Sequence, residues 1–243
     1  MIKNITKVLL LVFTLGCLYF MSRGAVGITA SYFLIIFNIV RVFLEIYAVK
    51  LLANKSNIRQ SIKEELPRKV GHMLICFITY PMIYFSFKGT IHMPLFIGLV
   101  LIFVLIAQPF GLLNIIEREV SDDNINAIKY LAIGAFILSV ISYFNPDFLI
   151  PASLGAMALG LGDPMACFVG KLFGKHKIVG NKTLEGVIGF IIGATIAMYI
   201  FSGISILKLI PIAICGAITE LYSNKYDNAL IQIVVCFTAY MLL

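Results

Sequence analysis

The sequence predicts an all-α, polytopic integral membrane bundle, and three observations lead to that class. The chain has 243 residues, of which 60% are hydrophobic and only 13% are charged, whereas soluble domains are about half apolar and a quarter charged. Its mean hydropathy is +1.00. Apolar stretches of about 20 residues, the length that crosses a bilayer as a helix, recur along the whole chain. We expect a single membrane-embedded domain over residues 1–243, because the longest polar stretch, residues 54–69, is too short to fold alone.

Nine apolar segments are expected to form spans or partial spans. The first follows Lys3 and Lys7, and no A-x-A-like cleavage site precedes Gly27, so a retained helix is favoured over a signal peptide. Several of the later segments are short, which favours tilted or partly spanning helices. The predicted segments are 5–22, 27–50, 67–87, 91–113, 127–144, 148–171, 184–202, 204–222 and 226–243.

The basic residues predict an orientation. If the N-terminus is cytoplasmic, the outer side holds only Arg23, Lys88 and Lys208, and Arg41 lies inside a span. All other lysines and arginines then fall on the cytoplasmic side, as the positive-inside rule requires. The sequence therefore predicts a cytoplasmic N-terminus and an external C-terminus. Basic residues that set this orientation also account for the net charge of +7, so the charge does not indicate nucleic-acid binding.

Three polar regions, residues 60–75, 160–190 and 218–230, gather on the predicted cytoplasmic face. A transporter would instead place polar groups near the membrane midplane and at both mouths. Only Arg41 and Glu45 lie near the midplane, four residues apart, and they are typical of a structural ion pair. Glu117 and residues 122–124 are most simply a solvated loop. This distribution favours a site that meets a water-soluble, anionic reactant from the cytoplasm, and makes a transporter or a lipid-binding scaffold the alternative.

The most unusual stretch is GDPMACFVGKLFGKHKIVGNKTLEG, residues 162–186. Asp163 lies in an apolar run beside Pro164, where the helix is expected to break. An ionisable group inside a membrane span is a candidate functional residue, because its burial is costly. Mg²⁺ together with phosphate ligands would offset that cost. The alternative is a helix cap whose charge a lysine neutralises.

The lysines after Asp163 are candidates for binding phosphate. A helix N-terminus with cations nearby binds phosphate well, and glycines allow the backbone to approach a ligand closely. Each lysine alone is also explained by the orientation of a cytoplasmic loop. The sequence has no G-x-x-x-x-G-K-[ST] and no protein-kinase catalytic loop, which excludes those two phosphotransfer folds. The candidate nucleotide-binding residues here are Lys171, Gly174, Lys175, Lys177, Lys182 and Thr183.

These motifs together resemble the polyprenol kinase family, which includes dolichol kinases, phytol kinases and CTP-dependent diacylglycerol kinases. The resemblance covers about residues 60–230 in three elements. The first is EELPRKVGH, with Glu65, Arg68, Lys69 and His72; the second is the glycine-rich stretch, ending in Lys182-Thr183-Leu184-Glu185-Gly186; the third is ELYSNKYDN, with Glu220, Asp227 and Asn228. CDP-diacylglycerol synthases carry a similar second element, but also an H-G-G-x-x-D-R-x-D signature that this chain lacks.

The resemblance implies a CTP-dependent kinase that phosphorylates a membrane isoprenoid alcohol such as phytol, a polyprenol or dolichol, with Mg²⁺ or another divalent cation. A CTP-dependent diacylglycerol kinase and a cytidylyltransferase that makes a CDP-lipid are the alternatives. Lipid alcohol from the bilayer and CTP from the cytoplasm would meet at the cytoplasmic face. The expected catalytic residues are Asp163, Glu185, Asp227 and His72; Arg68 and Lys69 join the candidate nucleotide-binding residues; and the expected metal ligands are Asp163, Glu220 and Asp227.

Overall fold

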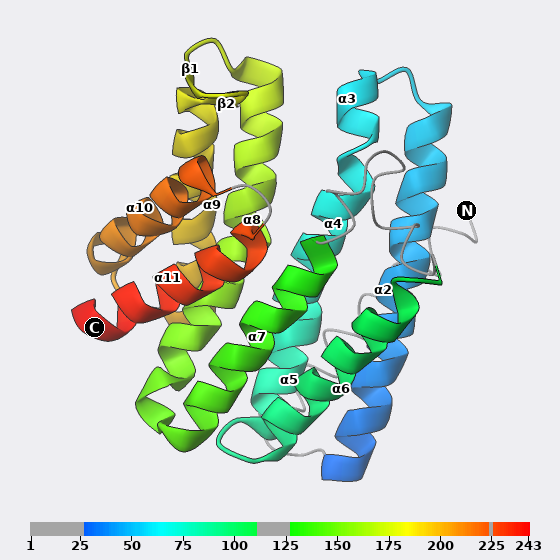
Figure 1. Ribbon diagram of the computed structural model, residues 1–243, viewed down its shortest axis with the longest axis vertical. Helices are drawn as coiled ribbons and strands as arrows, with labels where there is room; N and C mark the ends of the chain where they lie inside the picture. Colours follow the sequence, from blue (N-terminus) through cyan, green and yellow to red (C-terminus); the bar gives the residue numbers. More distant parts are fainter. Residues whose placement is uncertain (1–26, 111–126, 224–225) are drawn as a thin grey trace.

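A computed structural model describes residues 27–110, 127–223 and 226–243 and confirms the all-α membrane class (Figure 1). Five helical runs in these ranges are long and apolar enough to cross a membrane, namely Ile28–Lys55, Gln60–Phe87, Ala127–Phe144, Pro146–Phe173 and Leu184–Ser202. Two shorter apolar helices are His92–Ala107 and Asp227–Leu242. The first predicted segment, 5–22, lies outside the described residues, as do Glu117 and residues 122–124.

The elements follow the predicted segments closely, but several segments are divided. The helical run Gln60–Phe87 consists of α3, α4, the π-helical turn η1 and α5. A 3₁₀ turn, η2, precedes α8. The bounds are α2 Ile28–Lys55, α3 Gln60–Lys63, α4 Leu66–Leu74, η1 Ile75–Thr79, α5 Tyr80–Phe87, α6 His92–Ala107, α7 Ala127–Phe144, η2 Pro146–Phe148, α8 Leu149–Phe173, β1 Lys177–Val179, β2 Lys182–Thr183, α9 Leu184–Ser202, α10 Ile206–Tyr222 and α11 Asp227–Leu242.

Helix α2 separates lipid-facing from core-facing residues. Phe33 is 72% exposed and Leu44 is 65% exposed, as expected for side chains that face acyl chains, while Ile35 and Ile46 are fully buried. The predicted intramembrane ion pair is present, with Arg41 Nη1 lying 3.3 Å from Glu45 Oε1.

Helix α8 lies at the centre of the bundle and packs most extensively against α9. Small residues make this contact close. A Cβ atom on Gly189 would lie 2.9 Å from the carbonyl oxygen of Met165, and one on Gly193 would lie 2.8 Å from that of Leu161. Small residues at the interface are the usual means by which membrane helices approach each other.

The helix break predicted beside Asp163 is wrong, because α8 continues through Pro164 to Phe173. Proline removes one backbone hydrogen bond and crowds the preceding turn. Within a membrane bundle, neighbouring helices can hold such a helix together. Helix α8 is buried on most of its surface by those neighbours, and Asp163 therefore projects from a continuous helix.

The run from α4 to α5 reaches α8 at a π-helical turn. Cys76 lies in η1, and a Cβ atom on Gly160 would lie only 2.3 Å from the Cys76 Cβ. Only glycine at position 160 allows this approach. The contact lies about one turn from Asp163 on α8, so it brings the side chains of α4 close to that carboxylate.

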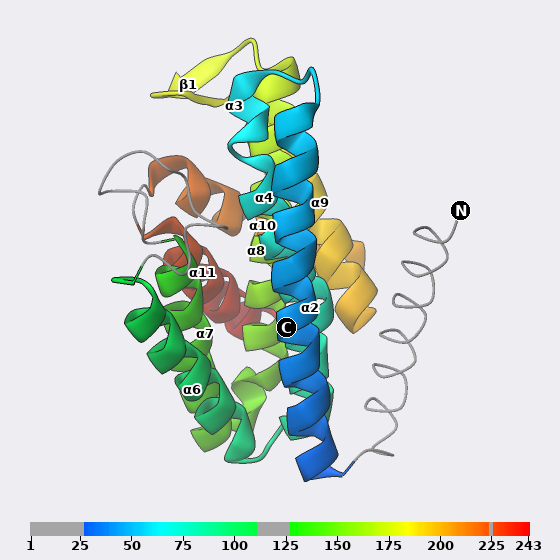
Figure 2. The ribbon, with the colours of Figure 1, turned by 90° about the vertical axis from the view of Figure 1, so that its right-hand side faces the viewer.

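A β-hairpin, which no sequence pattern predicted, joins α8 to α9. Strands β1 and β2 pair antiparallel, and Gly180 supplies a residue with φ of 54° at the turn. Thr183 ends the hairpin and caps α9 by accepting a hydrogen bond from the Gly186 N–H at 3.2 Å. The hairpin lies at the same end of the molecule as α3 (Figures 1 and 2), which we call the hairpin end.

Candidate active site

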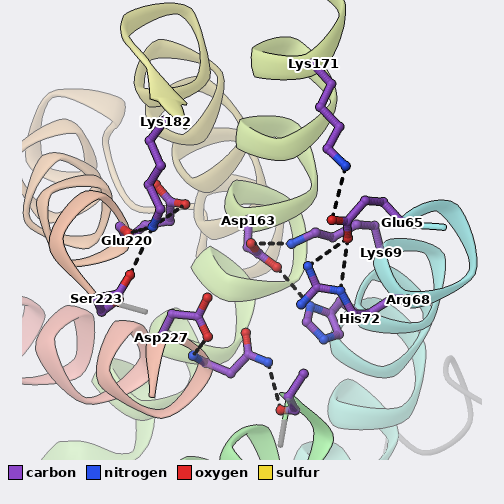
Figure 3. A network of polar contacts seen from close by, with 12 residues as sticks. Glu65, Arg68, Lys69, His72, Asp163, Lys171, Lys182, Glu220, Ser223 and Asp227 are labelled. Atoms are coloured by element: carbon purple, nitrogen blue, oxygen red, sulfur yellow. Dashed lines mark hydrogen bonds and ion pairs between the residues drawn. The ribbon is translucent and has the colours of Figure 1, made fainter. Parts of the chain in front are cut away.

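Asp163 of α8 is the centre of a buried polar network (Figure 3). The Lys69 Nζ donates a hydrogen bond to Asp163 Oδ1 at 2.5 Å, and the His72 Nδ1 lies 3.0 Å from Asp163 Oδ2. Asp163 is 4% exposed, and the other two residues are buried still further. The predicted catalytic residues Asp163 and His72 are therefore in direct contact, and both oxygens of the Asp163 carboxylate have cationic or N–H partners.

Glu65 organises the cations nearer the hairpin end. Its carboxylate accepts hydrogen bonds from Arg68 Nε at 3.1 Å and Arg68 Nη2 at 2.8 Å. It also accepts one from Lys171 Nζ at 3.2 Å, and Lys171 donates to the backbone oxygen of Ser61 at 2.7 Å. Glu65 is 2% exposed. This buried carboxylate thus holds one cation from α4 and one from α8 side by side.

A second group of side chains lies on the other side of Asp163 in Figure 3. The Lys182 Nζ lies 3.0 Å from Glu220 Oε1, and it donates to the backbone oxygens of Glu220 and Ser223. Asp227, at the start of α11, lies near enough to Asp163 for the two carboxylates to repel each other. The hairpin, α10 and α11 therefore bring two further carboxylates and one lysine to the site.

Asn228 is fully buried beside Asp227. Its Nδ2 donates to the backbone oxygen of Ala127 at 2.8 Å, which connects α11 to α7. Its Oδ1 has no hydrogen-bond partner among the described residues. A buried amide oxygen of this kind can accept from, or coordinate, a group that enters the site.

Other predicted site residues have contacts elsewhere. The Glu185 carboxylate, in the first turn of α9, accepts from the backbone N–H of His176 at 3.3 Å and lies 2.7 Å from the His176 ring Nδ1. Lys175 and Lys177 are exposed. Gly174 has a packing role, because a Cβ there would lie 2.2 Å from the Gly170 carbonyl oxygen and 2.8 Å from Thr183. The structure does not bring these residues into the network around Asp163.

Sequence reasoning assigned no role to Glu65, Ser223 or Asn228. The spacing of Glu65 and Arg68, three residues apart on a helix, could have indicated their pairing. The hydrogen bond from Lys171 to Glu65 joins residues 106 positions apart, so no local pattern could indicate it. Ser223 accepts from Lys182 through its backbone oxygen, which its residue type does not reveal.

The fold and the site together define a class: a helical membrane protein with a buried, charge-paired site assembled from three polar segments. Comparison with known proteins is consistent with this class. Residues 3–241 match the Cytidylyltransferase family, and the chain belongs to that family.

Two curated relatives are yeast dolichol kinases. The chain is 30% identical over 187 residues to dolichol kinase sec59 of Schizosaccharomyces pombe, covering 68% of this chain and 37% of that protein. It is 26% identical over 191 residues to the dolichol kinase of Saccharomyces cerevisiae, covering 71% of this chain and 36% of that protein. The chain thus spans little more than a third of these relatives' length.

A third relative extends the comparison to archaea. The chain is 33% identical over 130 residues to an uncharacterised protein of Methanocaldococcus jannaschii, covering 52% of this chain and 63% of that protein. No solved structure matches the chain. The predicted relationship to polyprenol kinases and cytidylyltransferases is confirmed at family level.

Proposed function

We propose that this protein is a membrane kinase that transfers the terminal phosphoryl group of CTP to a lipid alcohol of the isoprenoid class. The observation that carries the proposal is the buried contact of Lys69, Asp163 and His72, which is flanked by further Lys and Arg side chains. Phosphoryl transfer depends mainly on positioning and on neutralising charge, and such a site supplies both. The likeness to two dolichol kinases supports the same activity.

The nucleotide would bind at the hairpin end. Arg68, Lys171 and Lys182 each form an ion pair with a carboxylate of this chain, and a triphosphate offers each cation a stronger, multiply charged acceptor. Lys171 lies eight residues from Asp163 on α8, or about 12 Å along the helix axis. A nucleotide entering from water could therefore extend its phosphates from these cations toward Asp163.

A divalent cation fits Asp227 and Asn228 better than Asp163. The Asp163 carboxylate already contacts the Lys69 ammonium at 2.5 Å and the His72 ring, so a metal ion there would meet positive charge. Asp227 and the unpartnered Asn228 Oδ1 offer hard oxygen donors of the kind that Mg²⁺ prefers. When bound, the ion would neutralise charge on the phosphates. Glu220 could join it if Lys182 turned to the nucleotide.

A magnesium ion at this site would need only a few ligands from the protein. The described residues contain no group of three or more His, Cys, Asp or Glu side chains that could hold a metal ion. Mg²⁺ is commonly bound by one or two carboxylates together with substrate phosphates and water, so Asp227, Asn228 and a triphosphate are a sufficient set.

The acceptor would approach from the bilayer. Asp163 and His72 lie in helical runs that are long and apolar enough to span the membrane. A long-chain alcohol would keep its tail among acyl chains and bring its hydroxyl to the site, while the nucleotide stays at the aqueous end. The isoprenoid class rests on the likeness to dolichol kinases.

A cytidylyltransferase that makes a CDP-lipid is the second candidate, and the family match favours it. One assay separates the two. Purified protein in detergent would be given CTP, Mg²⁺ and either a polyprenol, a diacylglycerol or a phosphatidic acid. The kinase releases CDP and a lipid phosphate, whereas the cytidylyltransferase releases pyrophosphate and a CDP-lipid. Pyrophosphate with phosphatidic acid would overturn the kinase proposal, and so would the absence of CDP release with every alcohol.

A further inference from the structure

The buried His72 ring has one nitrogen with a partner and one without. One ring nitrogen, Nδ1, lies 3.0 Å from Asp163 Oδ2. The other, Nε2, is buried and has no hydrogen-bond partner among the described residues. A carboxylate at Nδ1 holds the neutral ring with its proton on that nitrogen, which leaves the Nε2 lone pair free to accept a proton.

Lys69 keeps the carboxylate in the form that this arrangement needs. Its ammonium donates to Asp163 Oδ1, while the opposite oxygen faces His72. The carboxylate is thus held ionised and oriented from the side away from the ring. Because an unsatisfied polar atom in a buried site is costly, the unpartnered Nε2 is expected to meet a hydroxyl donor during the reaction.

His72 lies deeper in the bundle than the cations proposed to bind the nucleotide. It follows Arg68 by four residues on the same face of α4, so it lies about 6 Å further from the hairpin end. The phosphate-binding cations proposed above are on the aqueous side of it. The lipid alcohol would come from the membrane side, where a hydroxyl could lie between Nε2 and the terminal phosphate.

We propose that His72 is the general base that deprotonates the acceptor alcohol and that Asp163 is its positioning residue; this rests on the proposed kinase function. Nε2 takes the hydroxyl proton while the alcohol oxygen forms a bond to the terminal phosphorus of CTP. The bond from that phosphorus to the bridging oxygen breaks, and CDP leaves with the electron pair. The imidazolium then returns its proton to water as the products depart.

The test compares His72→Ala and His72→Gln with His92→Ala, a matched histidine at the start of α6 whose Nδ1 contacts the Tyr32 hydroxyl. We expect kcat to fall about 10²- to 10⁴-fold in both His72 variants, with the KM for CTP within about threefold of wild type. His72→Gln retains a side-chain donor toward Asp163 and so controls for folding. Added imidazole should restore part of the His72→Ala rate and none of any loss in His92→Ala. Near-wild-type kcat in both His72 variants would overturn the proposal.

A second experiment adds a spectroscopic readout that does not depend on turnover. The chain has only three histidines, so ¹⁵N-histidine spectra in detergent can be assigned with single variants. Wild-type His72 should show a protonated Nδ1 and an unprotonated Nε2 at neutral pH, and Asp163→Asn should shift the tautomer balance and lower kcat more than it raises either KM. A His72 ring protonated on both nitrogens, or on Nε2 alone, would contradict the base role. Failure of the wild-type protein to release CDP would count against the kinase function, while the spectra would still decide the His72–Asp163 arrangement.

Discussion

Lys182 connects the hairpin to α10 through three acceptors, two of them backbone oxygens. Such a lysine is held in place before any ligand arrives. Lys175 and Lys177, by contrast, are exposed on the same hairpin. At the scale of single residues, the basic cluster that looked uniform in the sequence therefore divides into positioned cations and solvated ones.

Lys182→Gln should weaken CTP binding selectively. The amide can still donate to the backbone oxygens but carries no charge for the phosphates, so we expect kcat/KM for CTP to fall about ten- to a hundredfold and the KM for the lipid alcohol to stay within about twofold. Titrations of each substrate at saturating levels of the other measure this. Lys55→Gln, an exposed lysine outside the site, is the control. Equal and small effects of the two changes would mean that Lys182 only holds the hairpin to α10.

The π-helical turn η1 is the element that aligns α4 with α8. It places Cys76 against Gly160, while His72 and Lys69, about one and two turns earlier in the same run, reach Asp163. Single-turn π segments are frequent at functional sites. Here the close approach of η1 to α8 at Gly160 lies beside the buried charges, about one turn from Asp163.

Gly160→Ala should lower stability and activity although the substitution changes no polar group. The added Cβ would overlap the Cys76 Cβ, so the helices must separate, and overpacking of this kind costs about 1–3 kcal/mol. We expect a lower Tm and a kcat reduced about tenfold or more. Gly27→Ala is the control, because no atom lies within 4 Å of a Cβ at that position. Adding Cys76→Gly should recover much of the loss; a double variant as impaired as Gly160→Ala would refute the packing explanation.

At the scale of the whole molecule, the polar site is displaced toward one end of an apolar bundle. The hairpin and α3 lie together at that end (Figure 2), and Lys171 joins α8 to the backbone of Ser61 beside it. The opposite end carries Lys88, where α5 stops. The distribution of basic residues predicts that the hairpin end is the cytoplasmic one.

The orientation can be measured with a membrane-impermeant thiol reagent on sealed vesicles of known sidedness. Lys175→Cys should be modified only from the cytoplasmic side and Lys88→Cys only from the outer side, because both residues are exposed at opposite ends of the bundle. The parent chain, with its five native cysteines, supplies the background. Labelling of Lys175→Cys from the outer side alone would reverse the topology and remove the site from its proposed source of nucleotide.

The sequence by itself determined the membrane class, most helix positions and the three polar segments, because hydrophobic length and composition are local properties. It also indicated Asp163 and His72, since ionisable residues next to apolar runs are conspicuous. Only the tertiary structure decided which charges meet. The pairing of Asp163 with Lys69 and His72 joins residues more than 90 positions apart, and it depends on the close approach at Gly160. The continuity of α8 through Pro164 had the same origin, because packing by neighbouring helices outweighed the local preference of proline to end a helix.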